Sequence, residues 1–576
     1  MERSSSQRWV SVGLGTMTSL RVFLLILVWV THALCLGRRF LPRSIISSSF
    51  HRRAPMYLVG ENIDVESEEF AQHISRHPSF SPKDDSVSPG SRGSDDSFIS
   101  DNIIETIDDL KLQLNFLKQA ALVGFFTAVG IVIFKLSIQE TSKILYENLA
   151  DVLPKPAGFY WPQILFPVLG SVIVSILTYY RGLNIRRGVD KIAQSLDYDG
   201  NAATSNAQEL LRYNPFDQLF RISAAVATLG SGCSLGPEGP AVEIGAGLSC
   251  IFGSSGSPWQ KRHLFLAGTA AGVSAGFNAP IAGVFFALEC GKRFLKVNTM
   301  TLSAESKDGP RADVAAIVLA ATVAKVVVEF GLSDSNALAI QGNIFAMQSP
   351  LFELPLYLGL GVFAGIISTI FTRMLDYFTS VFGPSNVNAI GENSLKRVVS
   401  QIPLHLRPLF GGLLCGIVAL YYPQTVFVGY ATLDQLLAGK IHLPLLVLIQ
   451  LLGLKVILSS FSLGTGLVGG VFAPSLFFGA VAGTIYHDVI CNVFTAINNS
   501  VESLGGADLM PFFSIASAPA YATVGAAATL GALFRAPLTS TILMLELTEN
   551  HEIVIPVLIS SGLSGFLAEI LRGRKK

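Results

Sequence analysis

An acidic side chain framed by proline and glycine in a largely apolar stretch is the residue of this sequence best placed to do chemistry. Glu238 stands between Pro237 and Gly239, within the segment GSGCSLGPEGPAVEIG. A carboxylate inside a membrane segment is costly and therefore indicates function. It can compete with a passing anion for one site, and it can take up a proton when it leaves that site. We predict that Glu238 is a gate; the alternative is a structural carboxylate that caps the following helix.

The loop around Glu238 has a counterpart later in the chain. Gly236–Pro240 followed by AVEIGA and Gly470–Pro474 followed by SLFFGA share the pattern G-x-x-x-P-x-x-x-x-G-A. A second pair, FNAPIAGVFFALE at 277–289 and FRAPLTSTILMLE at 534–546, follows in the same order. Two halves with apolar segments broken by Gly and Pro at corresponding places are typical of transporters whose half-helices meet at a central binding site.

These loops predict an anion site that needs no cationic side chain. Each loop opens a helix, whose first turn has free N–H groups and carries about +0.5 charge from the helix dipole. Glycine lets an ion approach those amides, and fixed dipoles hold the ion weakly enough to release it. The sequence places such loops at Gly232–Pro240 and Gly464–Pro474. We therefore expect a small anion as the transported species.

The composition indicates an all-α polytopic membrane protein in contact with lipid. Half of the residues are hydrophobic and 14% are charged, which is too much apolar surface for a soluble chain of this length. A spanning helix needs ~20 apolar residues, and several uncharged runs are long enough. We expect helices, some too short to span alone, at 120–145, 163–180, 219–228, 241–252, 265–275, 282–294, 312–329, 355–378, 409–420, 444–458, 475–494, 518–532, 538–547 and 553–571.

The other polar residues favour structural roles over enzyme chemistry. Intramembrane polar side chains are isolated, and the six cysteines lack C-x-x-C spacing, so we expect no enzyme activity, metal, cofactor or nucleic-acid partner. Glu289 and Glu546 hold equivalent places in the second repeated pair, which predicts hydrogen bonding to broken backbone. Glu243, one turn after Pro240, is expected to act through the helix dipole; a second proton acceptor is the alternative.

The N-terminal hundred residues differ from the rest. Residues 1–55 are rich in Arg and Ser and contain one acid, Glu2, which is typical of a targeting peptide of plastid or bipartite type. We expect a chloroplast or other plastid membrane, thylakoid or envelope, with another internal membrane as the alternative. Residues 56–101 are acidic and Ser-rich and should be a disordered linker. The membrane transport domain is expected at 102–576.

Residues 120–571 resemble the CLC family of chloride channels and chloride/proton exchangers, in the manner of a plant or algal plastid-type member. The stretch Gly230–Gly245 is similar to the family's G-(R/K)-E-G-P segment, and Gly469–Pro474 to its G-x-F-x-P segment. The resemblance implies two inverted halves of many short, tilted and broken helices, and a homodimer in which each subunit carries its own anion pathway. It implies Glu238 as the gating glutamate and, around the anion, Leu183, Asn184, Gly236, Gly239, Val471, Phe472 and His551.

The sequence departs from the family pattern around this site. The family's first anion-binding segment, G-S-G-I-P, reads Gly-Leu-Asn-Ile-Arg at 182–186, so that Leu183 replaces a serine. Pro237 replaces a basic residue, and His551 stands where the family carries a tyrosine. A histidine there could donate a hydrogen bond to an anion and titrate near physiological pH; a bond to a neighbouring carbonyl is the alternative.

The position after Glu289 bears on proton coupling. Cys290 stands where exchangers usually carry an inner proton-transfer glutamate, and a buried thiol does not relay protons as a carboxylate does. We therefore predict a gated channel or uncoupled transporter for chloride or nitrate. A proton-coupled exchanger and a non-conducting regulatory subunit are the alternatives. Many relatives carry nucleotide-binding CBS modules after the membrane domain; the chain ends at Lys576, so we expect no ATP-binding regulatory module.

Overall fold

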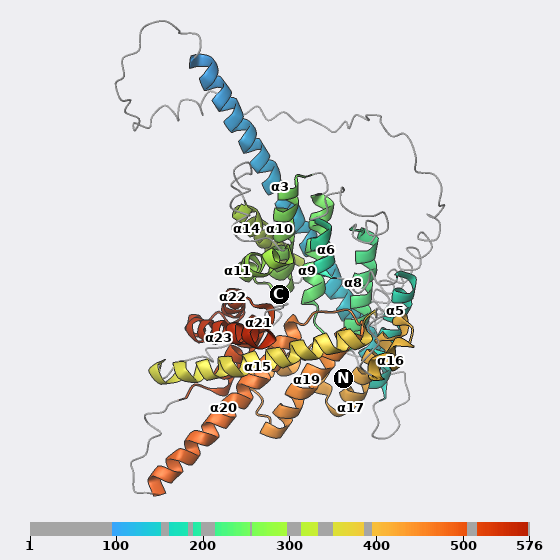
Figure 1. The fold of residues 1–576 in the computed structure, drawn as a ribbon, viewed down its shortest axis with the longest axis vertical. Coiled ribbons are helices and arrows are strands. Elements are labelled where there is room, and N and C mark those ends of the chain that lie inside the picture. Colours follow the sequence, from blue (N-terminus) through green and yellow to red (C-terminus); the bar gives the residue numbers. More distant parts are fainter. Residues whose placement is uncertain are drawn as a thin grey trace, which may run out of the picture. The chain divides into compact units, whose positions relative to one another are not determined.

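The computed structural model describes residues 95–150, 161–181, 188–196, 213–253, 256–295, 313–331, 350–384, 394–503 and 515–573. The expected targeting peptide, Leu183 and Asn184 lie outside these residues. The chain divides into residues 1–108 and 109–576, and the second unit contains the site. In the described part, regular structure is helical apart from one isolated β-bridge (Figure 1). This confirms the expected all-α fold.

The first half begins with a helix that starts inside the segment expected to be linker. The elements of this half are α3 (Asp95–Lys143), the π-helical turn η1 (Ile144–Leu149), α5 (Pro162–Arg181), α6 (Val189–Leu196), α8 (Pro215–Gly230), α9 (Glu238–Phe252), α10 (Pro258–Phe277), α11 (Pro280–Phe286), the π-helical turn η3 (Ala287–Gly291), α12 (Lys292–Phe294) and α14 (Asp313–Gly331).

The second half contains two short helices that periodicity alone did not reveal, α16 and α18. Both are too short to show a clear apolar face in the sequence. The elements are α15 (Pro350–Phe382), α16 (Ser394–Ser400), the 3-10 turn η6 (Leu404–Leu406), α17 (Pro408–Tyr421), the 3-10 turn η7 (Pro423–Thr425), α18 (Tyr430–Leu437), α19 (Leu445–Thr465), α20 (Phe472–Ser503), α21 (Ala518–Phe534), α22 (Pro537–Thr548), the 3-10 turn η9 (His551–Ile553) and α23 (Val554–Arg572).

Proline marks the start of several of these helices, and residues in the left-handed backbone conformation mark the ends of two. Proline stands in the first turn of α10, α11, α21 and α22, where its missing N–H has no helical partner to lose. Asn278 ends α10 and Arg535 ends α21, with φ of 62° and 51°. These two residues occupy the same position of the repeated Phe-x-Ala-Pro motif. The chain therefore reverses in the same way in both halves.

Long helices surround shorter ones. Among the described residues, eight helices are long and apolar enough to cross a membrane, including α5, α14, α15 and α19. The α11–η3 segment and α21 are apolar but shorter, and α9, with 15 residues, is also too short to span alone. Broken backbone inside a membrane is tolerated only where protein or a water-filled cavity covers it. The short helices are accordingly largely buried among their neighbours.

The two halves repeat one arrangement of helices. In the first half α9 packs on α10, which also contacts α11 and α14. In the second half α20 packs on α21, which also contacts α22 and α23. The equivalent helices α11 and α22 contact each other. When two halves are related by a two-fold axis, equivalent elements near the axis contact each other. The contact between α11 and α22 therefore agrees with the expected repeat.

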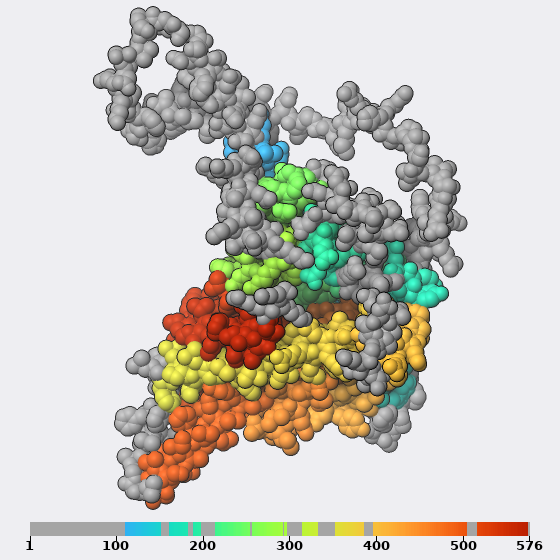
Figure 2. Space-filling model, viewed as in Figure 1, coloured from blue at the N-terminus to red at the C-terminus, as the bar shows by residue number. Residues whose placement is uncertain are grey.

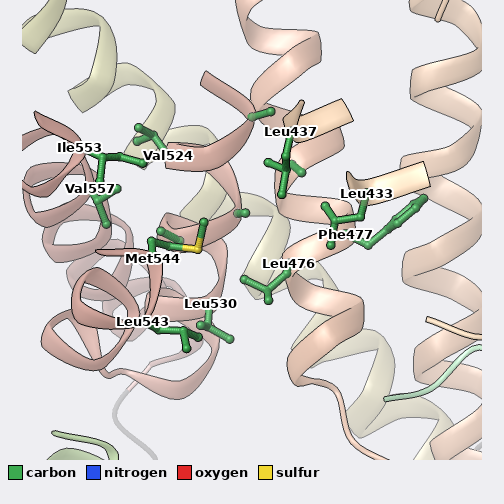
Figure 3. Close-up of a cluster of buried hydrophobic side chains, with 14 of the residues drawn as sticks. Leu433, Leu437, Leu476, Phe477, Val524, Leu530, Leu543, Met544, Ile553 and Val557 are labelled. Carbon is green, nitrogen blue, oxygen red and sulfur yellow. The ribbon is translucent and has the colours of Figure 1, made fainter. Parts of the chain in front are cut away.

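A large apolar cluster joins the helices of the second half. Figure 3 shows Leu433 and Leu437 of α18 in the same cluster as Leu476 and Phe477 of α20, together with side chains of α21, α22 and α23. On the face shown in Figure 2, α15 (yellow) lies between α23 (red) and the α19 and α20 pair (orange), and it contacts all three helices. This packing fixes α18 and α20 relative to each other.

Candidate functional site

The two repeated glycine loops meet in the interior. The Gly236 amide donates to the Gly470 carbonyl at 2.9 Å, and the Gly470 amide donates to the Gly236 carbonyl at 2.7 Å. This antiparallel bridge joins residues at identical positions of the two repeated patterns. Helix α9 begins at Glu238 and α20 at Phe472, two residues beyond the bridge in each case. The bridge therefore places two helix N-termini next to each other.

Only glycine fits at this junction. A Cβ on Gly239 would lie 2.8 Å from the Cα of Gly470, and a Cβ on Gly470 would lie 2.5 Å from the backbone nitrogen of Gly239. Both distances are far below van der Waals contact, and the obstructing atoms are backbone. The glycines that define the motif in the sequence thus let the two loops approach closely.

The Glu238 carboxylate lies at this junction and is buried, with the residue 3% exposed. Its Oε2 lies over Gly236, where Ala473 and Pro474 of α20 also pack. Tyr430 at the start of α18 donates its hydroxyl to Oε1, whereas Oε2 is buried without a hydrogen-bond partner among the described residues. A helix N-terminus is a favourable place for an anion. The Glu238 carboxylate therefore lies beside the N-terminus of α20.

The second repeated motif also converges on this place. The ring of Phe472, 4% exposed, lies 4.9 Å from the ring of Phe277 and 4.6 Å from the ring of Phe534. Phe277 and Phe534 are the first residues of the two Phe-x-Ala-Pro segments. Aromatic packing from both halves thus holds the first residue of α20 in position. Val471, just before it, is partly buried.

The glutamates that end the second motif pair cap helices of the opposite half. Glu289 accepts bonds from the Leu538 amide at 3.2 Å and from the Thr539 amide and hydroxyl at 2.7 and 2.6 Å. Glu546 accepts from the amides of α11, Ile281 at 2.9 Å and Ala282 at 2.7 Å. Each carboxylate thus satisfies free N–H groups at a helix start in the other half. The predicted hydrogen bonding to broken backbone is confirmed.

Glu243 has a specific partner. Arg221 of α8 donates to both of its carboxylate oxygens, at 2.5 and 2.8 Å, and Glu243 is 7% exposed. A bidentate pair with arginine is a strong and directional contact. The pair ties α9 to α8, a role that the sequence analysis missed because Arg221 lies 22 residues away in the chain. This geometry favours a structural role over that of a second proton acceptor.

The remaining predicted site residues lie apart from the loop junction. Cys290 is buried in η3, with its sulfur 3.7 Å from the Phe534 carbonyl. His551 is exposed in the 3-10 turn η9 that precedes α23, so the structure does not bring it into the buried junction. Its assignment as an anion ligand stays a prediction, as does that of Leu183 and Asn184, which lie outside the described residues.

Two lysines near the site went unnoticed in the sequence. Lys135 of α3 donates to the carbonyls of Ala275 and Gly276 at the end of α10, at 3.1 and 2.7 Å, and interacts electrostatically with Glu238. Lys455 of α19 is fully buried and bonds to backbone carbonyls. Lys455 is the only charged residue of α19, and Lys135 follows an uncharged run of α3 from residue 119 to 134. Charges in such apolar surroundings indicate functional or structural importance in a membrane. That signal could have identified them.

Comparison with known proteins decides the family. A family model described as "Voltage gated chloride channel" matches residues 170–569. The chain belongs to this family, which is the CLC family resembled in the sequence. Similar relatives include "Chloride channel protein CLC-e" of Arabidopsis thaliana, 34% identical over 78% of this chain and 59% of that protein. "H(+)/Cl(-) exchange transporter ClcA" of Yersinia pestis is 26% identical over 82% of this chain and 88% of that protein.

Solved structures of CLC proteins share the fold. A slow cyanobacterial Cl−/H+ antiporter superposes with a TM-score of 0.60 at 22% identity, covering 80% of this chain and 95% of that chain. A CLC-type fluoride/proton antiporter superposes with a TM-score of 0.56 at 18% identity, covering 79% and 95%. At such low identity these likenesses concern architecture alone. The chain spans 59% of CLC-e and 48% of "Chloride channel protein CLC-f" of the same plant, to which it is 33% identical over 72% of its own length.

Proposed function

We propose that this protein carries chloride or another small monovalent anion, such as nitrate, across a membrane, with Glu238 as the gate. The main support is the position of the Glu238 carboxylate at the N-terminus of α20, beside the bridge between Gly236 and Gly470. A side chain in this place blocks an anion and must leave for one to bind. Relatives named as a chloride channel and as a proton/chloride exchange transporter agree with this substrate class.

We favour a gated channel or uncoupled transporter. The position that would need a second proton-carrying carboxylate is occupied by Cys290, which is buried against the Phe534 carbonyl. The adjacent Glu289 accepts hydrogen bonds from three donors, which hold its side chain in place. A proton-coupled exchanger is the second candidate, since Glu238 itself can take up a proton and one relative is named as an exchanger.

The test is anion efflux from liposomes that contain the purified full chain, with chloride, nitrate and proton movement recorded together. Glu238→Gln removes the charge at nearly constant shape and should give anion flux that no longer depends on pH. Glu569→Gln, at an exposed position of α23, is the matched control and should behave as the wild type. Anion flux without stoichiometric protons supports the proposal.

Two outcomes would contradict it. Protons driven uphill by a chloride gradient would replace the uncoupled mechanism with exchange and direct attention to Lys135 and Glu238. The absence of anion flux from both the wild type and Glu238→Gln would reject transport and favour the non-conducting regulatory subunit.

We also propose a homodimer in a plastid membrane, with residues 1–55 as the targeting peptide, residues 56–101 as the linker and residues 102–576 as the transport domain. Large apolar side chains are exposed on α11, α22 and α23, among them Ile281, Leu538 and Phe566, which suits contact with lipid or with a second subunit. Cross-linking in liposomes tests the dimer, and a fluorescent fusion of residues 1–101 tests the targeting.

A further inference from the structure

A short segment between η7 and α18 lies against the loop that carries Glu238. The Phe427 amide donates to the Gly232 carbonyl at 3.1 Å, and the Tyr430 hydroxyl donates to the Glu238 carboxylate. Residues 425–430, which we call the strap, therefore touch the first repeated loop at two points, Phe427 and Tyr430. The strap belongs to the second half of the chain, whereas the loop belongs to the first.

A buried lysine holds the strap in place. The Lys455 ammonium donates to the carbonyls of Thr425 at 3.1 Å and Phe427 at 2.9 Å, and it lies 5.1 Å from the ring centre of Phe477. A buried charge is retained only where several polar or aromatic partners surround it. Lys455 is fully buried, so these contacts fix the backbone of the strap firmly to α19 and α20.

The backbone turn before Tyr430 directs its side chain. Gly429 has a φ of 84°, and a Cβ there would lie 2.8 Å from both the Gln424 carbonyl oxygen and the Phe477 ring, so glycine is needed on both counts. The helix that follows is anchored by Leu433 and Leu437 in the apolar cluster with α20 (Figure 3). Tyr430 is therefore held by rigid elements on either side, with its hydroxyl at the Glu238 carboxylate.

We propose that Tyr430 is a positioning residue for the gate, whose hydroxyl holds the Glu238 carboxylate in the place that blocks the anion. The inference rests on the proposed function. It adds that the Tyr430 hydroxyl determines how readily the Glu238 side chain moves out of the anion site. A phenol donates a strong hydrogen bond to a carboxylate and a weaker one to a protonated carboxyl group. Proton uptake by Glu238 therefore weakens the contact, and the side chain is released.

The titratable groups that act on the Glu238 carboxylate are Tyr430 from α18 and Lys135 from α3. Lys135 is already bonded to two carbonyls at the end of α10. Tyr430 is thus the donor whose loss leaves the surrounding fold unchanged while weakening the hold on the gate.

The test is Tyr430→Phe in the full chain, with anion efflux from liposomes measured across a range of pH. Loss of one hydrogen bond to a charged group should raise flux at neutral pH about tenfold. The midpoint of the pH–flux profile should move to higher pH, because the charged and docked carboxylate loses a donor. Tyr422→Phe removes a hydroxyl that donates to Gln450 at 2.9 Å and should leave the profile unchanged.

Adding Tyr430→Phe to Glu238→Gln identifies the target of the hydroxyl. The double variant should match Glu238→Gln alone, since the charged acceptor is absent. An added effect in the double variant would overturn the proposal, because it would show that the hydroxyl acts elsewhere. A wild-type profile for Tyr430→Phe would overturn the role of Tyr430 and leave the proposed transport intact. No anion flux from the wild type would overturn both.

Discussion

The junction of the two loops gives the sharpest test of how this fold builds a site. Gly470→Ala adds one methyl group where the structure leaves no space. Its Cβ would lie 2.5 Å from the backbone nitrogen of Gly239, 3.0 Å from the Cα of Gly239 and 3.2 Å from the carbonyl oxygen of Gly236. Gly470 is not among the described glycines with positive φ, so the effect of the substitution is steric.

The size of the effect follows from these distances. Non-bonded atoms prefer about 3.5–4.0 Å, so the two loops must separate by about 1 Å. The reciprocal bonds between Gly236 and Gly470, now 2.9 and 2.7 Å, would then exceed the usual range of about 2.7–3.2 Å. Two buried amides would lose their partners, at about 1–3 kcal/mol each. A displacement of this size at a reacting or binding centre can reduce a rate about a hundredfold.

Anion efflux from liposomes measures this loss, and we expect a reduction of about a hundredfold by that reasoning. The control is Gly562→Ala in α23, where an added Cβ meets nothing within 4 Å; its flux should equal that of the wild type. Wild-type flux in Gly470→Ala would refute the reasoning, since it would mean that the two N-termini need not meet at this separation. Equal losses in both variants would show that the effect is not specific to the junction.

Two further predictions concern the contacts that hold the halves together. Glu546→Gln weakens the acceptor for the Ile281 and Ala282 amides, and we expect a lower melting temperature in detergent from a loss of about 1–3 kcal/mol; a melting temperature unchanged from that of the wild type would argue against the cap. Arg221→Met leaves the Glu243 carboxylate buried without its bidentate partner, and a loss of about 3–5 kcal/mol is expected. The double variant Arg221→Met with Glu243→Met should recover most of the lost free energy of unfolding. A double variant as unstable as Arg221→Met alone would contradict the pairing.

Much of the architecture could be predicted because its signals are local. Each expected range for a long helix corresponds to a helix in the structure, since about 20 consecutive apolar residues admit few other solutions in a membrane. The short helices α6, α16 and α18 were missed, because eight or fewer residues do not fill the window of about 11–18 residues over which a helical pattern is recognised. The start of α3 at Asp95 was also missed, because a polar composition favours disorder only when no apolar helix continues the segment.

The candidate site was predicted only in part, because the sequence identifies only those site residues that belong to a repeated motif. Glu238, Gly236, Gly239 and Phe472 were singled out by repeated motifs, and the structure places all four at the loop junction. Tyr430 was not, because it precedes a short helix and belongs to no repeated motif. His551 was placed near the anion by its position after a motif, yet it is exposed.

The sequence by itself determined that this protein is a helical membrane protein of two repeated halves with a carboxylate in one glycine loop, because composition and motif spacing are properties of the chain alone. Only the tertiary structure decided which groups meet. The bridge between Gly236 and Gly470, the exchanged caps of Glu289 and Glu546, and the bond from Tyr430 to Glu238 join residues between 192 and 265 positions apart. Such contacts depend on how helices pack, and packing is set by the complementary shapes of many side chains at once.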